Sequence, residues 1–248
     1  MRPRLKITPR LPADNGLLFP HYTTTTELVL MKVFGLLMLL ALQVLVSCTN
    51  SVSSDTPAGP TQVDVKIGDQ VWMTQNLDVG VFRNGDTLRH ATTDAEWDSA
   101  THRGEPVWCY YNNDASNAAS FGRLYNWYAV TDPRGLAPTG YHVPSDAEWQ
   151  ALVAFLGGDQ DAGGSLKSSY GWSNNGNGTN SSGFFAMPGG SRRYDGNFSY
   201  FGSFGNWWSA TADDSTYAWA RNMASADYDV NRYSLHKTKG LSVRCVKD

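Results

Sequence analysis

The clearest pattern of apolar and polar positions lies at residues 145–156 and predicts a helix. Four large apolar residues recur there at i, i+3, i+4 and i+7: Trp149, Leu152, Val153 and Leu156. Positions with this spacing lie on one face of a helix, so the segment has a single apolar stripe. We expect this stripe to pack against the rest of the fold.

Signals for both ends of this helix stand in the sequence. Ser145 is a preferred N-cap residue, and Glu148 follows three positions later, as in a capping box. Pro144 keeps the incoming chain extended. Gly157 and Gly158 offer the left-handed conformation that ends many helices. No second helix of comparable strength follows.

Most other segments are short and predict strands separated by turns. Residues 63–67 alternate apolar and polar side chains, and Gly68-Asp69 predicts a turn into a hairpin partner at residues 70–73. Further strands are expected at residues 108–111, 184–187, 189–193, 207–210, 217–223 and 240–247. The aromatic segment 122–130 is expected to be buried, as either strand or helix. The fold class we expect is α+β, with one clear helix, short antiparallel strands and long loops.

The N-terminal part has a different pattern. Residues 1–30 show no periodicity, and either form a long n-region or precede a true start at Met31; we favour the second interpretation. Lys32 and the apolar run 33–46 form a secretory signal peptide (residues 31–47), too short for a membrane span, although an uncleaved anchor is the alternative. The sequence Leu-Val-Ser before Cys48 resembles a bacterial lipobox, which implies a lipid (palmitate) on Cys48.

Residues 48–62 are rich in Ser, Thr and Pro and predict a flexible tether. The domain then covers residues 63–248. A lipid-anchored domain of this kind belongs in the bacterial cell envelope, at the outer membrane, facing either the periplasm or the cell surface. The membrane, through the lipid on Cys48, is therefore the first expected partner.

Composition and net charge limit which classes of molecule can be further partners of the domain. Hydrophobic residues make up 41% of the 248 residues and aromatic residues 12%, enough for a core, while 24 glycines indicate loops. The net charge of the chain is −3, and the part from Cys48 onward contains 15 basic and 21 acidic residues. A negative domain without a basic stripe argues against nucleic acid.

The two cysteines of the domain, Cys109 and Cys245, are expected to form a disulfide, because an exported protein with two remaining cysteines most simply pairs them. Two separately buried thiols are the alternative. A metal site is the weakest option, since neither cysteine belongs to a C-x-x-C or H-x-x-x-H motif.

Six motifs in the domain carry a resemblance to a known family. They are residues 67–77 (IGDQVWMTQNL), 122–128 (GRLYNWY), 140–149 (GYHVPSDAEW), 188–190 (PGG), 207–209 (WWS) and 242–246 (SVRCV). The chain from about residue 63 to the end resembles the Fibrobacter succinogenes major paralogous domain. That family is similar to the formylglycine-generating-enzyme and C-type-lectin-like folds. The resemblance implies a single C-type-lectin-like domain, with paired N- and C-terminal strands and long loops that carry the ligand face.

The sequence supports no catalytic site. Formylglycine-generating enzymes bind copper through two cysteines near the C-terminus, and only Cys245 lies there. Ser234 and Lys237 match S-x-x-K, and the following Lys-Thr-Lys-Gly vaguely resembles K-T-G, but no S-D-N accompanies them. His142 is interpreted as a hydrogen-bonded structural histidine rather than a general base. We therefore expect no enzyme and no cofactor.

Loop oxygens that resemble calcium ligands are interpreted as solvated turns. They belong to Asn112, Asn113, Asp114, Asp213 and Asp214. The sugar-binding calcium motifs of C-type lectins, Glu-Pro-Asn and Trp-Asn-Asp, are absent from the sequence. No metal site is predicted.

The most suggestive region for binding is residues 217–236, where rigid aromatic residues alternate with adaptable polar ones. The candidate ligand-binding residues are Tyr217, Trp219, Arg221, Asn222, Tyr228, Asn231 and Tyr233. The region also resembles the variable region of lectin-fold proteins diversified by retroelements. An ordinary strand pair with a polar face is the alternative. A second aromatic group could stack a sugar ring or belong to the core: Tyr194, Phe198, Tyr200 and Phe201.

The preferred functional hypothesis is a lipid-anchored envelope module that binds a glycan or a surface protein. Two alternatives stay open: a structural or adhesive envelope component without a discrete ligand, and an enzyme with a degenerate formylglycine-generating-enzyme fold. Exposure of Tyr217, Tyr228, Asn231 and Tyr233 together on one face would favour the first hypothesis, and burial of most of them in the core would contradict it. A concave pocket holding a titratable pair would favour the enzyme.

Overall fold

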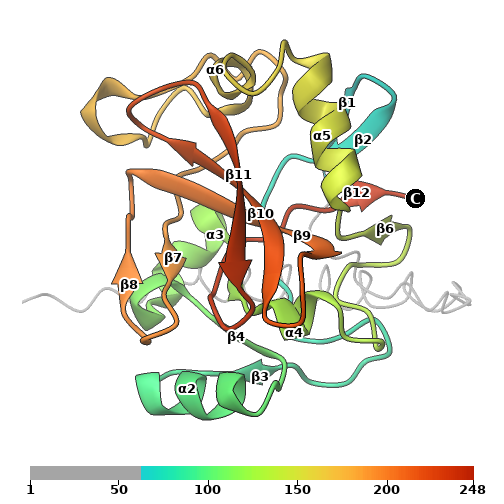
Figure 1. Cartoon of the computed structure of the whole chain (residues 1–248), viewed down its shortest axis with the longest axis vertical. Helices are drawn as coiled ribbons and strands as arrows, with labels where there is room; N and C mark the ends of the chain where they lie inside the picture. Colours follow the sequence, from blue (N-terminus) through green and yellow to red (C-terminus); the bar gives the residue numbers. More distant parts are fainter. Residues whose placement is uncertain (1–62) are drawn as a thin grey trace, which may run out of the picture. The chain divides into compact units, whose positions relative to one another are not determined.

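The structure is a computed structural model that describes residues 63–248, in which short helices surround several small sheets (Figure 1). The N-terminal extension, the signal peptide, Cys48 and the tether, all expected within residues 1–62, lie outside the described residues. Between residues 63 and 248 no helix has the length and apolar character that a membrane crossing requires. The α+β class is confirmed.

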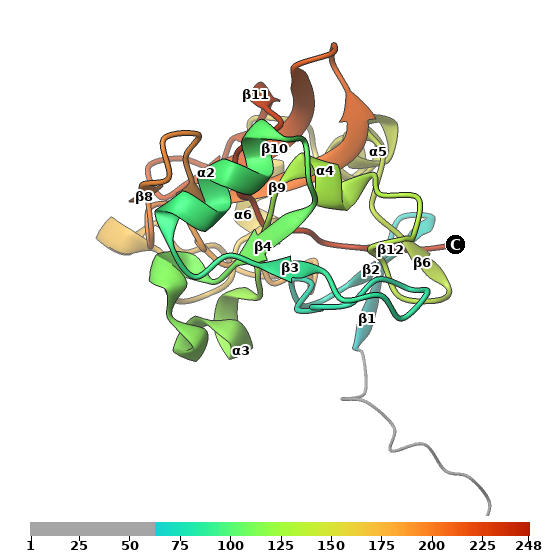
Figure 2. The same ribbon diagram turned by 90° about the horizontal axis from the view of Figure 1, so that it is seen from below.

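The first sheet joins the two ends of the domain. Its strands, in the order β1-β2-β12-β6, are β1 (Asp64–Ile67), β2 (Gln70–Met73), β12 (Val246–Lys247) and β6 (Tyr141–His142). β1 and β2 form the expected hairpin, and Val246 of β12 lies opposite Trp72 of β2. Figure 2 shows the C-terminus leaving at this sheet. The pairing of N- and C-terminal strands that the resemblance implied is therefore confirmed.

The second sheet is the longest and occupies the centre of Figure 1. Its order is β11-β10-β9, all antiparallel: β9 (Phe204–Ala212), β10 (Tyr217–Ala224) and β11 (Val230–His236). The two smaller sheets are β3-β4-β5, with β3 (Arg89–His90), β4 (Val107–Cys109) and β5 (Leu124–Tyr125), and β7-β8, with β7 (Ser191–Arg192) and β8 (Phe198–Ser199).

The predicted helix is confirmed as α5 (Asp146–Phe155). Ser145 accepts a hydrogen bond from the backbone N–H of Glu148, and the Glu148 carboxylate accepts one from the N–H of Ser145. Trp149, Leu152 and Val153 are buried. The expected stripe therefore anchors the helix.

The expectation of one clear helix is wrong, because a second helix of nine residues, α2 (Asp94–His102), precedes it. Thr93 and Glu96 form another capping box, and the buried face presents Trp97 and Ala100. The same local signal that marked α5 was present here. The remaining helices are one turn or little more: α3 (Ala118–Phe121), α4 (Trp127–Val130), α6 (Ala162–Leu166) and the 3₁₀ turns η1 (Tyr111–Asn113), η2 (Ala115–Asn117) and η3 (Ser173–Asn175).

Two predicted strands do not form as expected. Residues 184–187 are not a strand, because Phe185 has φ 60°, in the left-handed region that extended backbone does not use. Residues 240–245 pair only through isolated bridges to three different segments, so β12 is short. The segment 122–130, expected as either strand or helix, contains both: strand β5 followed by helix α4.

The central sheet is covered by apolar cores on both faces. Trp208 and Ala220 pack into one cluster with Tyr125 and Leu241. Trp207, the neighbour of Trp208, points to the opposite face and joins the cluster that surrounds α5. Strand alternation thus divides one run of residues between two cores.

A buried polar node connects the segments that meet beside these cores. Asn76 accepts hydrogen bonds from Trp207 Nε1 at 2.9 Å and from Arg244 Nη2 at 2.7 Å. Its amide nitrogen donates to the carbonyl of Phe121 at 2.9 Å. Arg244 also donates to the carbonyls of Met73 and Phe184. Asn76, Trp207 and Arg244 come from three of the six motifs, so these motifs converge on one network.

The expected Cys109–Cys245 disulfide is absent: both cysteines are free and fully buried. Cys245 belongs to the cluster of Trp208 and Leu241, whereas Cys109 packs with Trp97 and Leu124 in a separate cluster. Burial raises the pKa of each thiol to about 12. The alternative of two separately buried thiols is therefore the one that the structure has.

An ion cluster fastens α5 to the central sheet. Arg221 and Arg232 lie opposite each other on β10 and β11, an arrangement that brings two cations together. Asp146 accepts from Arg221 Nη1 at 2.7 Å and from Arg232 Nε at 3.0 Å. Burial favours the neutral carboxyl, but the hydrogen bonds from the two arginines outweigh it and lower the pKa of Asp146.

We expect Asp146→Asn to lower the free energy of unfolding by about 3 kcal/mol at pH 7, because it leaves the buried Arg221 without a counter-ion. A carboxyl with a lowered folded-state pKa stabilises the fold above its unfolded pKa of about 3.9 and ceases to do so as the pH falls through the folded value. The difference in unfolding free energy between the wild type and Asp146→Asn, measured by urea unfolding, should therefore persist from pH 7 to about pH 4 and shrink below it.

The matched control is Asp98→Asn, which removes an exposed carboxylate of α2 that lies 3.0 Å from His102 Nδ1. It should change the unfolding free energy by less than about 1 kcal/mol. Equal losses in the two variants would contradict the assignment of Asp146 as the buried counter-ion.

Candidate ligand-binding site

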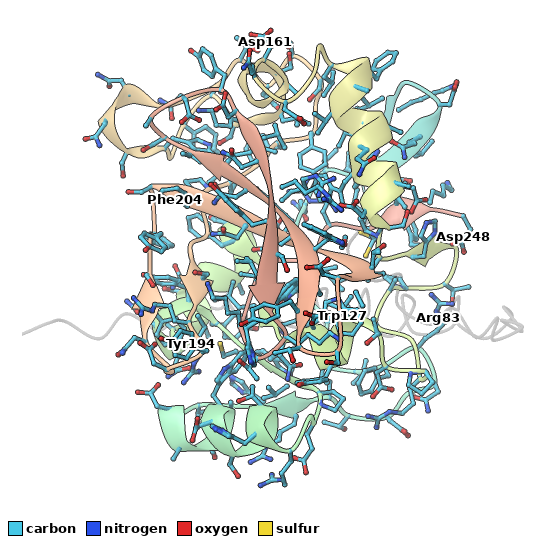
Figure 3. All side chains as sticks on the ribbon, viewed as in Figure 1. Arg83, Trp127, Asp161, Tyr194, Phe204 and Asp248 are labelled. Atoms are coloured by element: carbon cyan, nitrogen blue, oxygen red, sulfur yellow. The ribbon has the colours of Figure 1, made fainter. Side chains whose placement is uncertain are left out.

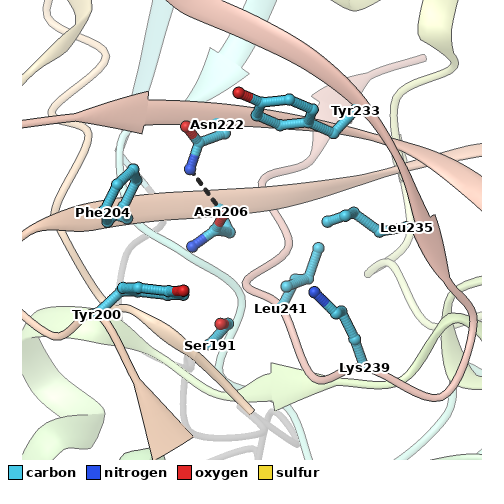
Figure 4. A pocket seen from close by; sticks show the side chains of 9 residues that line it. All are labelled: Ser191, Tyr200, Phe204, Asn206, Asn222, Tyr233, Leu235, Lys239 and Leu241. Atoms are coloured by element: carbon cyan, nitrogen blue, oxygen red, sulfur yellow. Dashed lines mark hydrogen bonds between the residues drawn. The ribbon is translucent and has the colours of Figure 1, made fainter. Parts of the chain in front are cut away.

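A hollow of about 280 Å³ opens beside one end of the central sheet (Figure 4). This volume is close to the lower end of the range for small-molecule sites. The side chains that line it come from β7, from the loop after β8, from all three strands of the central sheet and from the segment after β11. They are Ser191, Tyr200, Phe204, Asn206, Asn222, Tyr233, Leu235, Lys239 and Leu241.

Two buried amides at the hollow are oriented by a chain of hydrogen bonds. Asn206 on β9 and Asn222 on β10 are directly opposite in the register, so their side chains share a face. Asn206 Nδ2 donates to the carbonyl of Gly190 at 3.1 Å, and its Oδ1 accepts from Asn222 Nδ2 at 2.8 Å. Oδ1 of Asn222 accepts no hydrogen bond from the described residues. One amide oxygen therefore remains available as an acceptor.

Aromatic side chains stand around these amides. Tyr233 is 48% exposed and Tyr200 is 55% exposed, and both line the hollow. Tyr200 packs edge-on against Phe204, with ring centroids 4.9 Å apart. Its backbone has φ 70°, an uncommon conformation for an aromatic residue, and its carbonyl accepts hydrogen bonds from the N–H groups of Ser203 and Phe204. Strained residues of this kind cluster at functional sites.

Lys239 supplies the only basic group of the hollow's lining. Figure 4 shows its amine end directed into the hollow beside Leu241. Burial, and secondarily the charge of Arg193, lower the pKa of Lys239, while Asp195 acts in the opposite direction. The lining contains no acidic residue. The hollow thus combines aromatic surface, oriented amides and one amine.

Three of the sequence-predicted residues come together here. Asn222 and Tyr233 line the hollow, and Asn231 lies opposite Asn222 on β11, on the same sheet face. Asn206, Asn222 and Asn231 therefore form a row across the three strands. The sequence-based hypothesis selected two members of this row.

Three other predicted residues belong to the opposite face by strand alternation: Tyr217, Trp219 and Arg221. Arg221 is 2% exposed and its guanidinium is engaged by Asp146, so its assignment to an exposed ligand surface is wrong. Trp219 is half-buried beneath the guanidinium of Arg232, whose central carbon lies 3.2 Å from the ring centroid. Tyr217 is exposed and packs edge-on against His236.

Tyr228 occupies the turn between β10 and β11, away from the hollow's lining. Its backbone carbonyl accepts from the N–H of Gly163, and its ring lies 4.9 Å from the amine of Lys167. A Cβ at Gly163 would collide with that carbonyl, which explains why glycine is required at this position. Although Tyr228 is exposed, the predicted tyrosines do not share one face.

The sequence-based hypothesis missed several residues of the hollow, chiefly Ser191, Phe204, Asn206 and Lys239. Asn206 directly precedes the Trp207-Trp208 motif. Because side chains alternate along a strand, Asn206 lies on the same face of β9 as Trp208. In the sequence, Lys239 belongs only to a segment that vaguely resembles K-T-G, which does not indicate a binding role. Its position in the hollow depends on the long-range placement of the segment after β11, for which no local signal exists.

The second aromatic group is also divided. Tyr200 joins the hollow, whereas Phe198 and Phe201 pack against Tyr111 with centroid distances of 5.2 and 4.7 Å. Tyr194, labelled in Figure 3, is exposed and lines a different hollow with His102 and His236. Of this group, only Tyr200 belongs to the candidate site.

His142 has the hydrogen-bonded environment expected of a structural histidine. Nε2 lies 2.7 Å from Glu148 Oε1, and Nδ1 lies 2.8 Å from Asp248 Oδ1. Burial lowers its basicity, but the hydrogen bonds to the two carboxylates outweigh this effect and raise the pKa of His142. The three side chains lie at the edge of the sheet that joins the two chain ends, and His142 does not line the candidate hollow.

Two of the five loop residues considered for calcium accept hydrogen bonds from neighbouring backbone N–H groups. Asp114 caps the N–H of Ser116, and Asp214 accepts from the N–H groups of Thr216 and Tyr217. Within residues 63–248, no group of three or more His, Cys, Asp or Glu side chains is arranged to hold a metal ion.

Comparisons with known proteins identify one related family. The family model described as the Fibrobacter succinogenes major domain matches residues 65–247, nearly all of the described domain. Neither a comparison with curated proteins nor one with solved structures gave a significant match.

The strain at Tyr200 can be measured by comparing two variants that both remove the ring. Tyr200→Ala keeps a Cβ at φ 70°, whereas Tyr200→Gly does not, so we expect the glycine variant to be more stable by about 1 kcal/mol. For a domain of this size, that corresponds to a Tm about 2–4 °C higher. Equal melting temperatures in calorimetry would show that the backbone of Tyr200 stores no strain.

Proposed function

The chain belongs to the Fibrobacter succinogenes major domain family, and we propose that it is a lipid-anchored binding module of the bacterial cell envelope that recognises a saccharide. The binding site in this proposal is the hollow at the end of the central sheet. The single observation that carries the proposal is the pair of oriented, buried amides between exposed tyrosines.

The chemistry of the hollow suits a sugar ring. The apolar C–H face of a sugar can lie against Tyr200 or Tyr233, because aromatic rings offer a large contact area at low entropic cost. The free amide oxygen of Asn222 can accept a hydrogen bond from a sugar hydroxyl. Since this amide is already held by Asn206, little orientational freedom is lost when a ligand binds.

Binding is favoured over catalysis by what the lining lacks. Its titratable side chains are Tyr200, Tyr233 and Lys239, and no hydrogen bond joins any two of them in the described structure. A nucleophile and a base, or an acid and a base, would need such proximity. The proposal therefore assigns recognition, and no reaction, to this hollow.

The envelope location rests on the N-terminal sequence. The apolar run 33–46 followed by Cys48 has the form of a lipoprotein signal, and the tether of residues 48–62 would separate the lipid from the domain. We include in the proposal a palmitate-bearing lipid on Cys48, the outer membrane as its location and a C-type-lectin-like arrangement of the domain.

A screen of the full chain in detergent against immobilised glycans tests the proposed site. We expect Tyr233→Ala and Asn222→Leu to weaken binding to any glycan found by at least about tenfold, because the first removes a stacking surface and the second removes the free acceptor. Equilibrium titration with the selected glycan gives the affinities, and thermal melting verifies the fold of each variant.

Tyr217→Ala is the control for Tyr233→Ala. Tyr217 is 40% exposed, close to the 48% of Tyr233, but belongs to the opposite sheet face. Its loss should leave glycan affinity within about twofold of the wild type. Binding that depends on Tyr217 and not on Tyr233 would move the site to the other face, and the absence of any glycan binding would refute the proposed function.

Lipid anchoring is tested separately with Cys48→Ser in bacterial cells that are labelled with a palmitate analogue. The thioether that carries the diacylglyceryl group requires the Cys48 thiol, so the variant should lose the label and leave the membrane fraction. Labelling that persists in Cys48→Ser would contradict the lipoprotein assignment, since Cys109 and Cys245 are fully buried in the domain.

A further inference from the structure

We propose that the hollow selects acidic saccharides, those that carry a carboxylate or a sulfate ester, and that Lys239 is the residue that makes this selection. The inference rests on the proposed function and deepens it by naming the ligand class. Its basis is the contrast between Lys239 and the other lysines that the fold withdraws from solvent.

The buried amines of Lys167 and Lys237 each donate hydrogen bonds to two backbone carbonyls. The amine of Lys167 donates to the carbonyls of Ala224 and Asp227 at 3.0 and 2.7 Å. The amine of Lys237 donates to the carbonyls of Asp214 and Ser215 at 2.7 and 3.0 Å. Each amine thus recovers within the protein the hydrogen bonds that it loses with water.

Lys239 differs because its amine has no such acceptor. The side chain is half-buried, yet its amine forms no hydrogen bond or ion pair with any residue between 63 and 248. The closest acidic influence is Asp195, which is already paired with Arg193 at 3.2 Å. The cation at the hollow is therefore uncompensated by the protein.

The surroundings strengthen the attraction for an anion. Leu235 and Leu241 line the hollow beside the amine, as Figure 4 shows, and apolar walls reduce the screening of a charge by water. No carboxylate lines the hollow to repel a negative group, and Arg193 adds a second positive charge nearby. An anionic ligand group would complete the coordination that the fold leaves open at Lys239.

The other residues that line the hollow indicate that the anionic group belongs to a saccharide. Tyr200 and Tyr233 offer ring faces, and Asn222 offers an acceptor for a hydroxyl, so an anion with no ring or hydroxyl would use only Lys239. A uronic acid or a sulfated sugar would use all three kinds of group at once. The shared chemistry is a negative charge on a polyhydroxylated ring.

The test compares sugars that differ only in charge, by calorimetric titration of the full chain in detergent. The probes are methyl glycosides of glucuronic, galacturonic and mannuronic acid, their neutral uronamides, and 6-sulfated glucose and galactose with their unsulfated parents. We expect at least one acidic member to bind on the order of tenfold more tightly than its neutral counterpart. Preference among the uronates or among the sulfates identifies which anion the hollow accepts.

Variants of Lys239 connect this preference to the residue. Lys239→Met keeps most of the aliphatic length and should abolish the difference between acidic and neutral partners, while binding of the neutral sugar is retained. Lys239→Arg should keep a preference for the acidic sugar. Lys66→Met, which removes the same charge from an exposed position on β1, should change neither. Melting temperatures establish that each variant is folded.

The outcomes separate the inference from the proposed function. Equal affinity for acidic and neutral sugars, or a preference that survives Lys239→Met, overturns the role of Lys239 while leaving saccharide recognition intact. Binding of free acetate and sulfate as tightly as the acidic sugars would show an anion site without saccharide recognition. Failure of the neutral and acidic sugars alike would refute both.

Discussion

The domain depends on a buried guanidinium that is held almost entirely by carbonyl oxygens. Arg244 is 1% exposed and carries no ion pair with a carboxylate among the described residues. Its hydrogen bonds go to the side chain of Asn76, to the carbonyl of Met73 at the end of β2, and to the carbonyl of Phe184 in the irregular segment before β7. Burial lowers the pKa of Arg244 from its usual value, and the carbonyl dipoles offset part of that cost.

This arrangement explains how a loop-rich chain reaches one structure. The segment around Phe184 and Phe185 cannot pair as a strand, so its carbonyls need other donors. Arg244 supplies them and, through Asn76, connects the same loop to Trp207 of the central sheet. The side chain of Arg244 thereby donates to acceptors of the N-terminal hairpin and of the loop before β7. These hydrogen bonds hold the irregular loop in one conformation.

In the central sheet, neighbouring residues lie on opposite faces and contact different parts of the fold. Arg221 and Asn222 are adjacent in sequence, but one meets Asp146 beneath α5 and the other meets Asn206 at the hollow. A register shift of a single residue would exchange the two faces, leaving buried charges unpaired and the amides in an apolar core. The pairing of two cations with one carboxylate therefore stabilises the very register that assembles the proposed binding site. The stability of the fold and the geometry of the proposed binding site therefore both depend on this strand.

Local chemistry in the sequence was sufficient for the elements whose signals lie within a few residues. The capping box of Ser145 and Glu148, the hairpin around Gly68-Asp69 and the long strand β10 depend on near neighbours, and each formed where expected. A second capping box, formed by Thr93 and Glu96, carries the same local signal and begins α2. The composition of residues 217–236 also pointed to the part of the chain that contributes Asn222 and Tyr233.

Only the tertiary structure decided which of those residues act together. Tyr217 and Tyr233 have the same residue type and similar exposure, yet strand alternation and register place them on opposite faces. Lys239 and Tyr200 reach the hollow from segments that no local pattern connects, and the two cysteines were separated by the packing of different cores. The sequence by itself determined helix α5, the β1–β2 hairpin and the aromatic and polar composition of residues 217–236, because these depend on near neighbours in the chain. The site and the fate of the cysteines arise from contacts between distant segments, and only the folded chain specifies those.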